Sequence, residues 1–379
     1  MFRRKRNWII FGLIIVVIAM LIGGVGYTQY QKTQAPEETR DPIQKQINHM
    51  TLDEKIGQLF VAKTSGVKPK QVEQNVKEYH LGGLLISSDA YYHTNRQQFK
   101  KQLAKYQNQA QIPLGLAADQ EGGTVSRLDI NHKITNVARY PSPMEIYQAG
   151  GLKNNVKWAK LTAKNLHELG FNWDFAPVAD VATDKNAFIY DRTIGQNYQK
   201  TAQYIKKVVP AMQNQGIATS VKHFPGYGNA GDTHDGGATA ERTKAQIMRE
   251  DAVPFKAAVQ QHAASIMVTH VVLDKVDPGR PATISKKDIN LLRHDLNYNG
   301  VIITDSMQMG AMTKYAKAHH INADVAALEA GNDVILSNDF KTSVPKIKQA
   351  VRSGKLSEKQ IDESVYRVLK MKQTYFKDK

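Results

Sequence analysis

Eight short apolar runs, separated by segments with helical periodicity, constrain the fold of this chain more than any other feature. Each run has the length and flanking turn residues of a buried strand. Strands that alternate with helices form parallel sheets, and eight such units close into a (β/α)8 barrel. The sequence therefore predicts an α/β fold of the TIM-barrel type. The runs are residues 56–62, 81–86, 113–118, 171–181, 217–221, 265–272, 300–303 and 333–336.

The segments between these runs have the spacing of amphipathic helices. Ala202, Ile205 and Val208, for example, recur at the three-residue step of one helix face. Near the end of the chain, Ser357 and Gln360 have the spacing of a capping box that opens a last helix. Only about forty residues follow the eighth run, so we expect no second domain after the barrel.

The N-terminal part of the chain is predicted to be a membrane anchor. Residues 8–27 contain no charged side chain, and their number matches the ~20 residues that a helix needs to span a bilayer. The cluster Arg3-Arg4-Lys5-Arg6 precedes them and should stay in the cytoplasm, which places the rest of the chain outside the cell. The alternative is a signal peptide cleaved near the small residues 23–26, and the chain would then be secreted.

These patterns divide the chain into three parts. Residues 1–27 form a basic cytoplasmic stub and a transmembrane helix. Residues 28–44 are polar, contain a proline and lack periodicity, so we expect a flexible linker. Residues 45–379 are predicted to form the barrel, and we expect it to act as a monomer.

The composition excludes several classes of function. The chain has no cysteine, which rules out disulfides, thiolate metal sites, a nucleophilic thiol and a lipidated cysteine. Its net charge is +16, but the basic residues are scattered, and no basic motif interleaved with aromatic residues is present. We therefore expect no nucleic-acid partner, and we interpret the excess charge as solvated surface that attracts an anionic envelope.

A Gly-rich segment after the fifth run carries four ionisable side chains, Lys222, His223, Asp232 and His234. The active site of such a barrel is built from loops at the carboxyl ends of the strands. Polar residues follow other runs as well, and we expect all of them to converge on one face of the barrel. They are Asp119 and Arg127 after the third run, Asp180 near the end of the fourth and Arg192 after it, His270 near the end of the sixth and Asp305 after the seventh.

Four motifs in this set resemble those of glycoside hydrolase family 3, and more narrowly those of its single-domain β-N-acetylhexosaminidases, which release terminal N-acetylglucosamine. The resemblance covers about residues 47–372 in unbroken order. It implies a TIM-type barrel without cofactor or metal. The motifs are Asp119-Gln-Glu-Gly-Gly, Lys222-His-Phe-Pro-Gly, Asp232-x-His234 and Ile303-Thr-Asp305-Ser-Met.

The resemblance also implies roles for individual residues. Asp305 matches the nucleophile, and His234 matches the acid/base, which Asp232 orients. A second group of residues matches those that hold the hydroxyls and the acetamido end of the sugar. The members of this group are Asp119, Arg127, Arg192, Lys222 and His223.

The chemistry of glycoside cleavage agrees with these roles. The transition state is oxocarbenium-like, so a carboxylate such as Asp305 can trap the anomeric carbon while a second group protonates the leaving oxygen. An imidazole can give and take a proton near neutrality, and a neighbouring carboxylate fixes its tautomer. The sequence therefore predicts a retaining exo-β-N-acetylglucosaminidase that acts on N-acetylglucosamine-containing, cell-wall-type glycans.

Several positions allow more than one interpretation from the sequence. Tyr227 and Asn229 stand where many family members have His and Asp, which obscures the contacts to the leaving group. Asp180 is interpreted as structural. Glu121 is a possible acid, but the glycines beside it indicate a tight turn, and His270 is either part of the site or part of a buried polar network.

Other activities compete with this interpretation. A β-glucosidase of the same family usually takes its acid from an additional C-terminal domain, which this chain lacks. Phosphate could replace water as the acceptor, because histidine repels anions less than glutamate does. A metal-dependent amidohydrolase needs a His-x-His pair in the first strand, whereas residues 60–63 read Phe-Val-Ala-Lys. A wall-binding barrel without activity would be favoured only if the Asp305, His234 and Asp232 set were broken.

Overall fold

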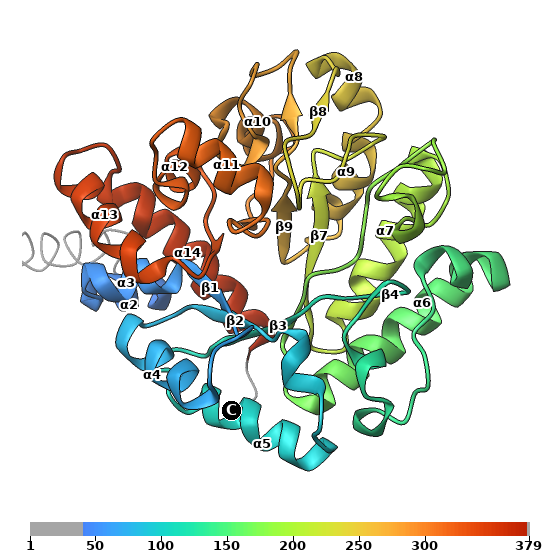
Figure 1. Cartoon of the computed structure of the whole chain (residues 1–379), viewed down its shortest axis with the longest axis horizontal. Coiled ribbons are helices and arrows are strands. Elements are labelled where there is room, and N and C mark those ends of the chain that lie inside the picture. The colour runs from blue at the N-terminus through green and yellow to red at the C-terminus, as the bar shows by residue number, and fades with distance from the viewer. Residues whose placement is uncertain (1–40, 377–379) are drawn as a thin grey trace, which may run out of the picture. The chain divides into compact units, whose positions relative to one another are not determined.

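The computed structural model describes residues 41–376, and its central feature is a parallel sheet of eight strands (Figure 1). A bridge between Ile303 and Val334 links the two end strands, so the sheet nearly closes into a barrel. This confirms the predicted α/β fold, and the closure is consistent with a TIM-type barrel. In spatial order the strands are β11 (Val301–Thr304), β9 (Ser265–Val268), β7 (Ala218–Phe224), β6 (Trp173–Asp174), β3 (Gly115–Ala118), β2 (Gly83–Leu85), β1 (Phe60–Lys63) and β12 (Ile335–Leu336).

Each predicted apolar run overlaps one of these strands, but the runs predicted at residues 56–62, 171–181 and 265–272 are longer than their strands. In the first of them the extra residues belong to a helix. Residues 56–58 belong to helix α3 (Leu52–Gln58), which Thr51 and Glu54 open with a capping box. The chain enters β1 only at Phe60. A short buried helix followed directly by a buried strand produces one continuous apolar run, and periodicity alone does not separate the two.

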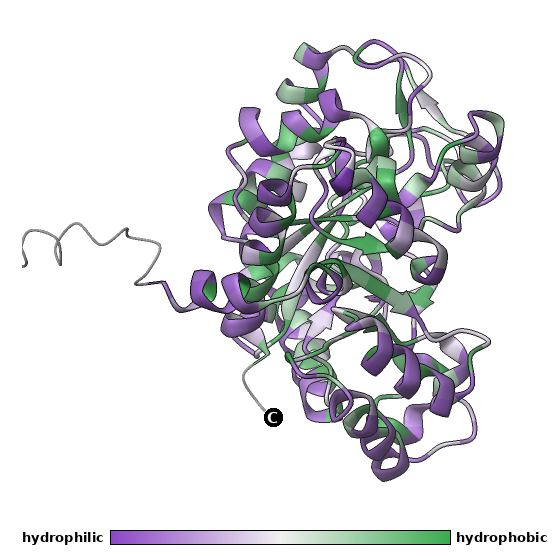
Figure 2. Ribbon diagram, turned by 90° about the vertical axis from the view of Figure 1, so that its left-hand side faces the viewer, coloured by the Kyte–Doolittle hydropathy of each residue, from purple (hydrophilic) through white to green (hydrophobic). Residues whose placement is uncertain are grey.

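Helices surround the strands, and colouring by hydropathy shows green strands inside a mostly purple exterior (Figures 1 and 2). Outside the barrel sheet, β4 (Gln120–Gly122) pairs with β5 (Val125–Ser126), and β8 (Thr239–Ala240) pairs with β10 (Val272–Leu273). The other helices are α4 (Pro69–Tyr79), α5 (Arg96–Gln107), α6 (Pro143–Leu169), α7 (Tyr198–Gln213), α8 (Lys244–Arg249), α9 (Ala252–Gln260), α10 (Lys286–Asn290), α11 (Gly310–Ala318), α12 (Ala323–Ala330), α13 (Phe340–Arg352) and α14 (Glu358–Tyr375).

The carboxyl ends of the strands carry charged and polar side chains. All seven residues of β7 are buried, and Lys222 and His223 lie in its second half. Asp119 directly follows β3, and Asp305 directly follows β11. Parallel strands end on one face of the barrel, so these side chains converge although they are far apart in the sequence.

The predicted anchor, residues 8–27, lies outside the described residues. Among residues 41–376, no helix is both long enough and apolar enough to cross a bilayer. Most of the predicted linker, residues 28–44, also lies outside the described part. Its last three residues begin helix α2 (Pro42–His49), which the side chain of Asp41 caps.

Candidate active site

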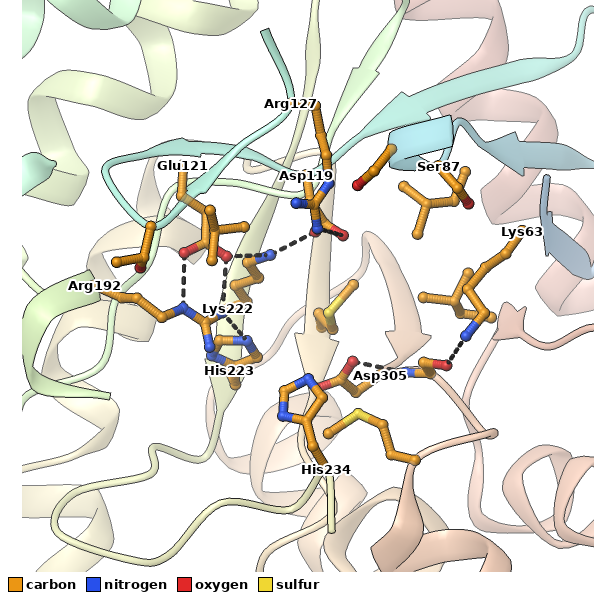
Figure 3. A pocket seen from close by; sticks show the side chains of 18 of the residues that line it. Lys63, Ser87, Asp119, Glu121, Arg127, Arg192, Lys222, His223, His234 and Asp305 are labelled. Atoms are coloured by element: carbon orange, nitrogen blue, oxygen red, sulfur yellow. Dashed lines mark hydrogen bonds and ion pairs between the residues drawn. The ribbon is translucent and has the colours of Figure 1, made fainter. Parts of the chain in front are cut away.

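A cavity of about 660 Å³ opens at the carboxyl ends of the barrel strands (Figure 3). Seven of the eight site residues predicted from the sequence line it, and the eighth, Asp232, contacts one of the seven. The structure therefore gathers the whole predicted set in one place. The seven that line the cavity are Asp119, Arg127, Arg192, Lys222, His223, His234 and Asp305.

A network of buried ion pairs forms one wall of the cavity. Lys222 Nζ lies 2.8 Å from Asp119 Oδ1 and 2.7 Å from Glu121 Oε1. Arg192 binds Glu121 through two hydrogen bonds, Nε to Oε2 at 2.9 Å and Nη2 to Oε1 at 2.8 Å. Arg127 is more loosely placed, with Nη2 3.9 Å from Asp119 Oδ2. Glu121 and Asp119 thus hold the three cations Lys222, Arg192 and Arg127 in place.

Glu121 is an ion-pair partner rather than a free acid. Burial alone raises the pKa of its carboxyl, but Arg192 and Lys222 outweigh burial and hold the pKa far below its usual range. For Lys222 burial works to lower the pKa, and the carboxylates of Asp119 and Glu121 raise it. Both partners are therefore charged at neutral pH, and Glu121 has no proton to donate.

His223 is held in one tautomer by its two neighbours. Its Nδ1 lies 2.7 Å from Asp180 Oδ2, and its Nε2 lies 3.2 Å from Arg192 Nη2. The guanidinium can only donate, so Nε2 accepts and the Nδ1–H donates to Asp180. The other oxygen of Asp180 accepts from the backbone N–H of Tyr227 at 2.8 Å. Asp180 therefore positions both His223 and the start of the following loop, in agreement with its predicted structural role.

Asp305 presents an ionised carboxylate to the cavity. Its backbone N–H donates to the Val268 carbonyl at 2.9 Å, and its Oδ1 accepts from the Ser306 N–H at 2.7 Å. Burial raises the pKa of Asp305, but the neighbouring His270, the Ser306 N–H and Lys222 lower it below its ordinary value. A carboxylate held in this state is available as a nucleophile at neutral pH.

His234 and Asp232 lie together on the loop that follows β7. His234 Nδ1 is 2.6 Å from Asp232 Oδ1, and the same oxygen accepts from the backbone N–H of His234 at 2.9 Å. The His234 side chain is 56% exposed, and in Figure 3 it lies on the same side of the cavity as Asp305. The carboxylate fixes the ring so that Nε2 is the nitrogen left for a ligand.

The root of this loop is firmly anchored. The buried Tyr227 packs in an apolar cluster with Ile189 and Val271, and its hydroxyl lies 2.5 Å from Thr233 Oγ1. Asn229 Oδ1 accepts from the backbone N–H groups of residues 183 and 184 at 3.0 and 3.1 Å. The two positions that depart from the family pattern therefore stabilise the loop.

The tip of the loop rests on the start of α11. Gly310 N–H donates to the His234 carbonyl at 2.7 Å, and the N–H of Ala311 donates to the Thr233 carbonyl at 3.1 Å. A Cβ at Gly310 would lie only 2.6 Å from the His234 oxygen. The absence of a side chain at this position is therefore what allows the His234 backbone to approach the helix.

Lys63 is a cavity residue that the sequence analysis did not assign. It ends β1, and its Nζ donates to Ser306 Oγ at 2.8 Å (Figure 3). Burial lowers its pKa, while Asp305 and Asp119 raise it. Its position at the end of a predicted strand was the sequence signal that could have identified it. Over residues 41–376, no group of three or more His, Asp or Glu side chains could hold a metal ion.

Comparison with known proteins connects this geometry to a family. The model of the glycosyl hydrolase family 3 N terminal domain matches residues 51–371. The chain is 31% identical over 332 residues to beta-hexosaminidase LpqI of Mycobacterium tuberculosis, a match that covers 84% of this chain and 82% of that protein. The solved structure of M tuberculosis LpqI has a TM-score of 0.76 at 29% identity, and the match covers 85% of this chain and 94% of that one.

A second solved structure is similar to the same degree. It is a glycoside hydrolase family 3 beta-N-acetylglucosaminidase from Paenibacillus sp. str. FPU-7, with 32% identity and a TM-score of 0.79. The match covers 86% of this chain but 63% of the Paenibacillus chain, so this chain spans less than two thirds of that relative.

Proposed function

The chain belongs to glycoside hydrolase family 3, and on that premise we propose that it is an exo-β-N-acetylglucosaminidase that removes terminal N-acetylglucosamine from cell-wall-type glycans with retention of configuration. Two relatives, one named a beta-hexosaminidase and one a beta-N-acetylglucosaminidase, support the substrate class.

The observation that carries the proposal is the pairing of two groups at one cavity. Asp305 supplies a carboxylate whose pKa lies below its ordinary value, and His234 supplies an imidazole oriented by Asp232. A glycosidase that retains configuration needs a nucleophile and an acid/base of this kind. Glu121, another carboxylate of the cavity, is engaged by two cations and is unsuited to proton transfer.

In the proposed mechanism Asp305 attacks the anomeric carbon while the His234 Nε2–H protonates the departing glycosidic oxygen. This step breaks the glycosidic bond and forms a covalent glycosyl ester on Asp305. Water then attacks the anomeric carbon, His234 takes up a proton of that water, and the carboxylate of Asp305 leaves. Asp232 keeps the imidazole in the required orientation and stabilises its charged form.

The sugar itself is proposed to contact the wall formed by Asp119, Arg127, Arg192, Lys222 and His223. Glu121 and Asp180 hold these side chains in place before the substrate arrives, so little reorganisation is needed on binding. All the residues in the proposal come from one chain, and it requires no second copy. We further propose that residues 8–27 hold the barrel at the outer face of the membrane, as their apolar, charge-free sequence suggests.

The proposal is tested with β-N-acetylglucosaminides that have good and poor leaving groups. We expect His234→Ala to slow a poor leaving group, such as a sugar alcohol, ~10²-fold or more and an activated nitrophenolate far less. Asp232→Ala should have the same pattern with a smaller effect. Equal slowing of both substrates by His234→Ala would contradict its role as the acid.

The nucleophile and the reaction type need separate measurements. Asp305→Ala should abolish turnover of both substrates, and proton NMR of the wild-type reaction should show the β-anomer first. An α-anomer as the first product would refute double displacement. Adding phosphate should not increase the rate, which distinguishes a hydrolase from a phosphorylase. Aryl β-glucosides should be poor substrates, which distinguishes the enzyme from a β-glucosidase. Protease digestion of intact cells tests the orientation of the chain, and retention in the membrane fraction tests the anchor.

A further inference from the structure

His270 lies behind the cavity wall, directly beyond the end of β9, and its side chain is fully buried. Its Nδ1 is 2.5 Å from Thr283 Oγ1, on the short helix η6 (Ala282–Ile284). Its Nε2 is 2.9 Å from the carbonyl oxygen of Ser306. Both ring nitrogens of this histidine are therefore within hydrogen-bond distance of an oxygen.

The number of hydrogens available for these contacts is decisive. The single hydrogen of the Thr283 hydroxyl is donated to the Thr269 carbonyl at 2.7 Å. Thr283 Oγ1 can therefore only accept from His270, which requires a hydrogen on Nδ1. The Ser306 carbonyl has no hydrogen, which requires a second hydrogen on Nε2. A neutral imidazole carries one N–H and would leave one of these buried contacts without a hydrogen.

Charged groups nearby oppose the effect of burial. Burial is the largest effect and lowers the pKa of His270, whereas the carboxylate of Asp305 and the Ser306 carbonyl raise it. The other titratable groups that act on the ring are His234 and His223, and each lowers its pKa if charged. Burial by itself favours the neutral ring. The neutral ring, however, lacks the hydrogen for one of its two hydrogen bonds, and a buried oxygen next to an unprotonated nitrogen is also unfavourable.

We propose that His270 is a permanent imidazolium and serves as a positioning residue for the nucleophile. It holds the carbonyl of Ser306, whose backbone N–H in turn donates to Asp305 Oδ1 at 2.7 Å. Lys63 holds the same serine from the other side through Ser306 Oγ. A fixed positive charge behind Asp305 favours its carboxylate over its protonated form and over the glycosyl ester. The catalytic part of this inference rests on the proposed function of Asp305.

The protonation state is measured by NMR on the full-length chain with 15N-labelled histidine side chains. At about pH 8, where an ordinary histidine is neutral, His270 should show two protonated ring nitrogens. The signals are assigned by their loss in His270→Gln. A single protonated nitrogen at this pH would overturn the proposal, whatever the enzymatic activity of the chain.

Two matched variants at Thr283 test the hydrogen-bond count without altering His270. Thr283→Ser keeps the hydroxyl and should keep both ring N–H signals. Thr283→Val removes the acceptor and should remove the Nδ1–H signal at the same pH. Retention of both signals in Thr283→Val would show that this contact does not set the protonation state and would refute the argument.

The positioning role is read from the acid limb of the pH profile of kcat/KM. If the charge of His270 holds Asp305 ionised, His270→Gln and Thr283→Val should move this limb upward by about one pH unit, while Thr283→Ser leaves it in place. An unmoved limb in both altered variants, with the imidazolium present in the wild type, would refute the positioning role. Complete absence of glycosidase activity in the wild type would refute the proposed function instead, and the NMR result would still decide the state of His270.

Discussion

Gly310 is the position at which a single methyl group should displace the acid/base without touching the cavity. In Gly310→Ala the new Cβ would lie 2.6 Å from the His234 carbonyl oxygen and 2.8 Å from the backbone of Asp235. Ordinary C···O contacts lie at about 3.4 Å, so the loop must move by about 0.8 Å. A displacement of this size at a reacting group reduces the rate by up to about 10²-fold.

The fold should tolerate this substitution. The weakened hydrogen bond from Gly310 N–H to the His234 carbonyl removes about 1 kcal/mol of stability. Alanine in the first turn of α11 recovers about 0.5–1 kcal/mol relative to glycine. The free energy of unfolding should therefore change little, and a loss of activity would not reflect unfolding.

The assay compares kcat/KM for poor and activated leaving groups. We expect Gly310→Ala to slow the poor leaving group about 10- to 100-fold and the activated one several-fold less, because only the former needs the proton. Gly237→Ala is the control, since a Cβ there meets nothing within 4 Å in the same loop. An equal loss on both substrates, or no loss on either, would refute the idea that Gly310 seats His234.

Three further predictions concern stability and metal dependence. Glu121→Gln leaves the buried Arg192 and Lys222 without their shared carboxylate, so it should lower the free energy of unfolding by about 3–5 kcal/mol in urea denaturation; an unchanged midpoint would contradict the ion-pair network. Burial raises the pKa of Asp288 to about 7, so ionisation of this carboxyl destabilises the fold increasingly between about pH 4 and pH 7. The free energy of unfolding of Asp288→Asn relative to that of the wild type should therefore rise over this window, by at most about 4 kcal/mol. A pH-independent difference would show that the carboxyl titrates normally. Dialysis against a strong chelator should leave turnover unchanged, and a loss that zinc restores would revive the amidohydrolase alternative.

Much of the site was predictable because a barrel places its strand ends together. Asp119, Lys222 and Asp305 follow or end strands that are visible as apolar runs, so their convergence follows from the fold alone. Arg127 and Arg192 come from loops farther beyond the strands. Their place after strand ends predicted that they reach the same face, and the family resemblance assigned them to the sugar. The structure shows that they reach the cavity.

Other features depend on contacts between distant segments and have no local signal. The sequence left the role of Tyr227 and Asn229 undefined, and the structure shows that both side chains anchor the loop. His270 acquires its partners from Thr283 and from the backbone of Ser306, and its surroundings could not be inferred from neighbouring residues in the sequence. The helix before β1 was missed because helix and strand share one apolar run.

The division between a cavity wall built on strands and an acid/base carried by a loop has a consequence for protein engineering. In the proposed mechanism, choice of the sugar and choice of the acceptor are encoded in separate stretches of chain, since the loop contributes His234 and Asp232 while the wall comes mainly from β3, β7 and their extensions. Libraries confined to residues 228–237 could therefore alter which alcohol departs or which nucleophile enters, including a second sugar in synthesis, while the donor sugar stays the same.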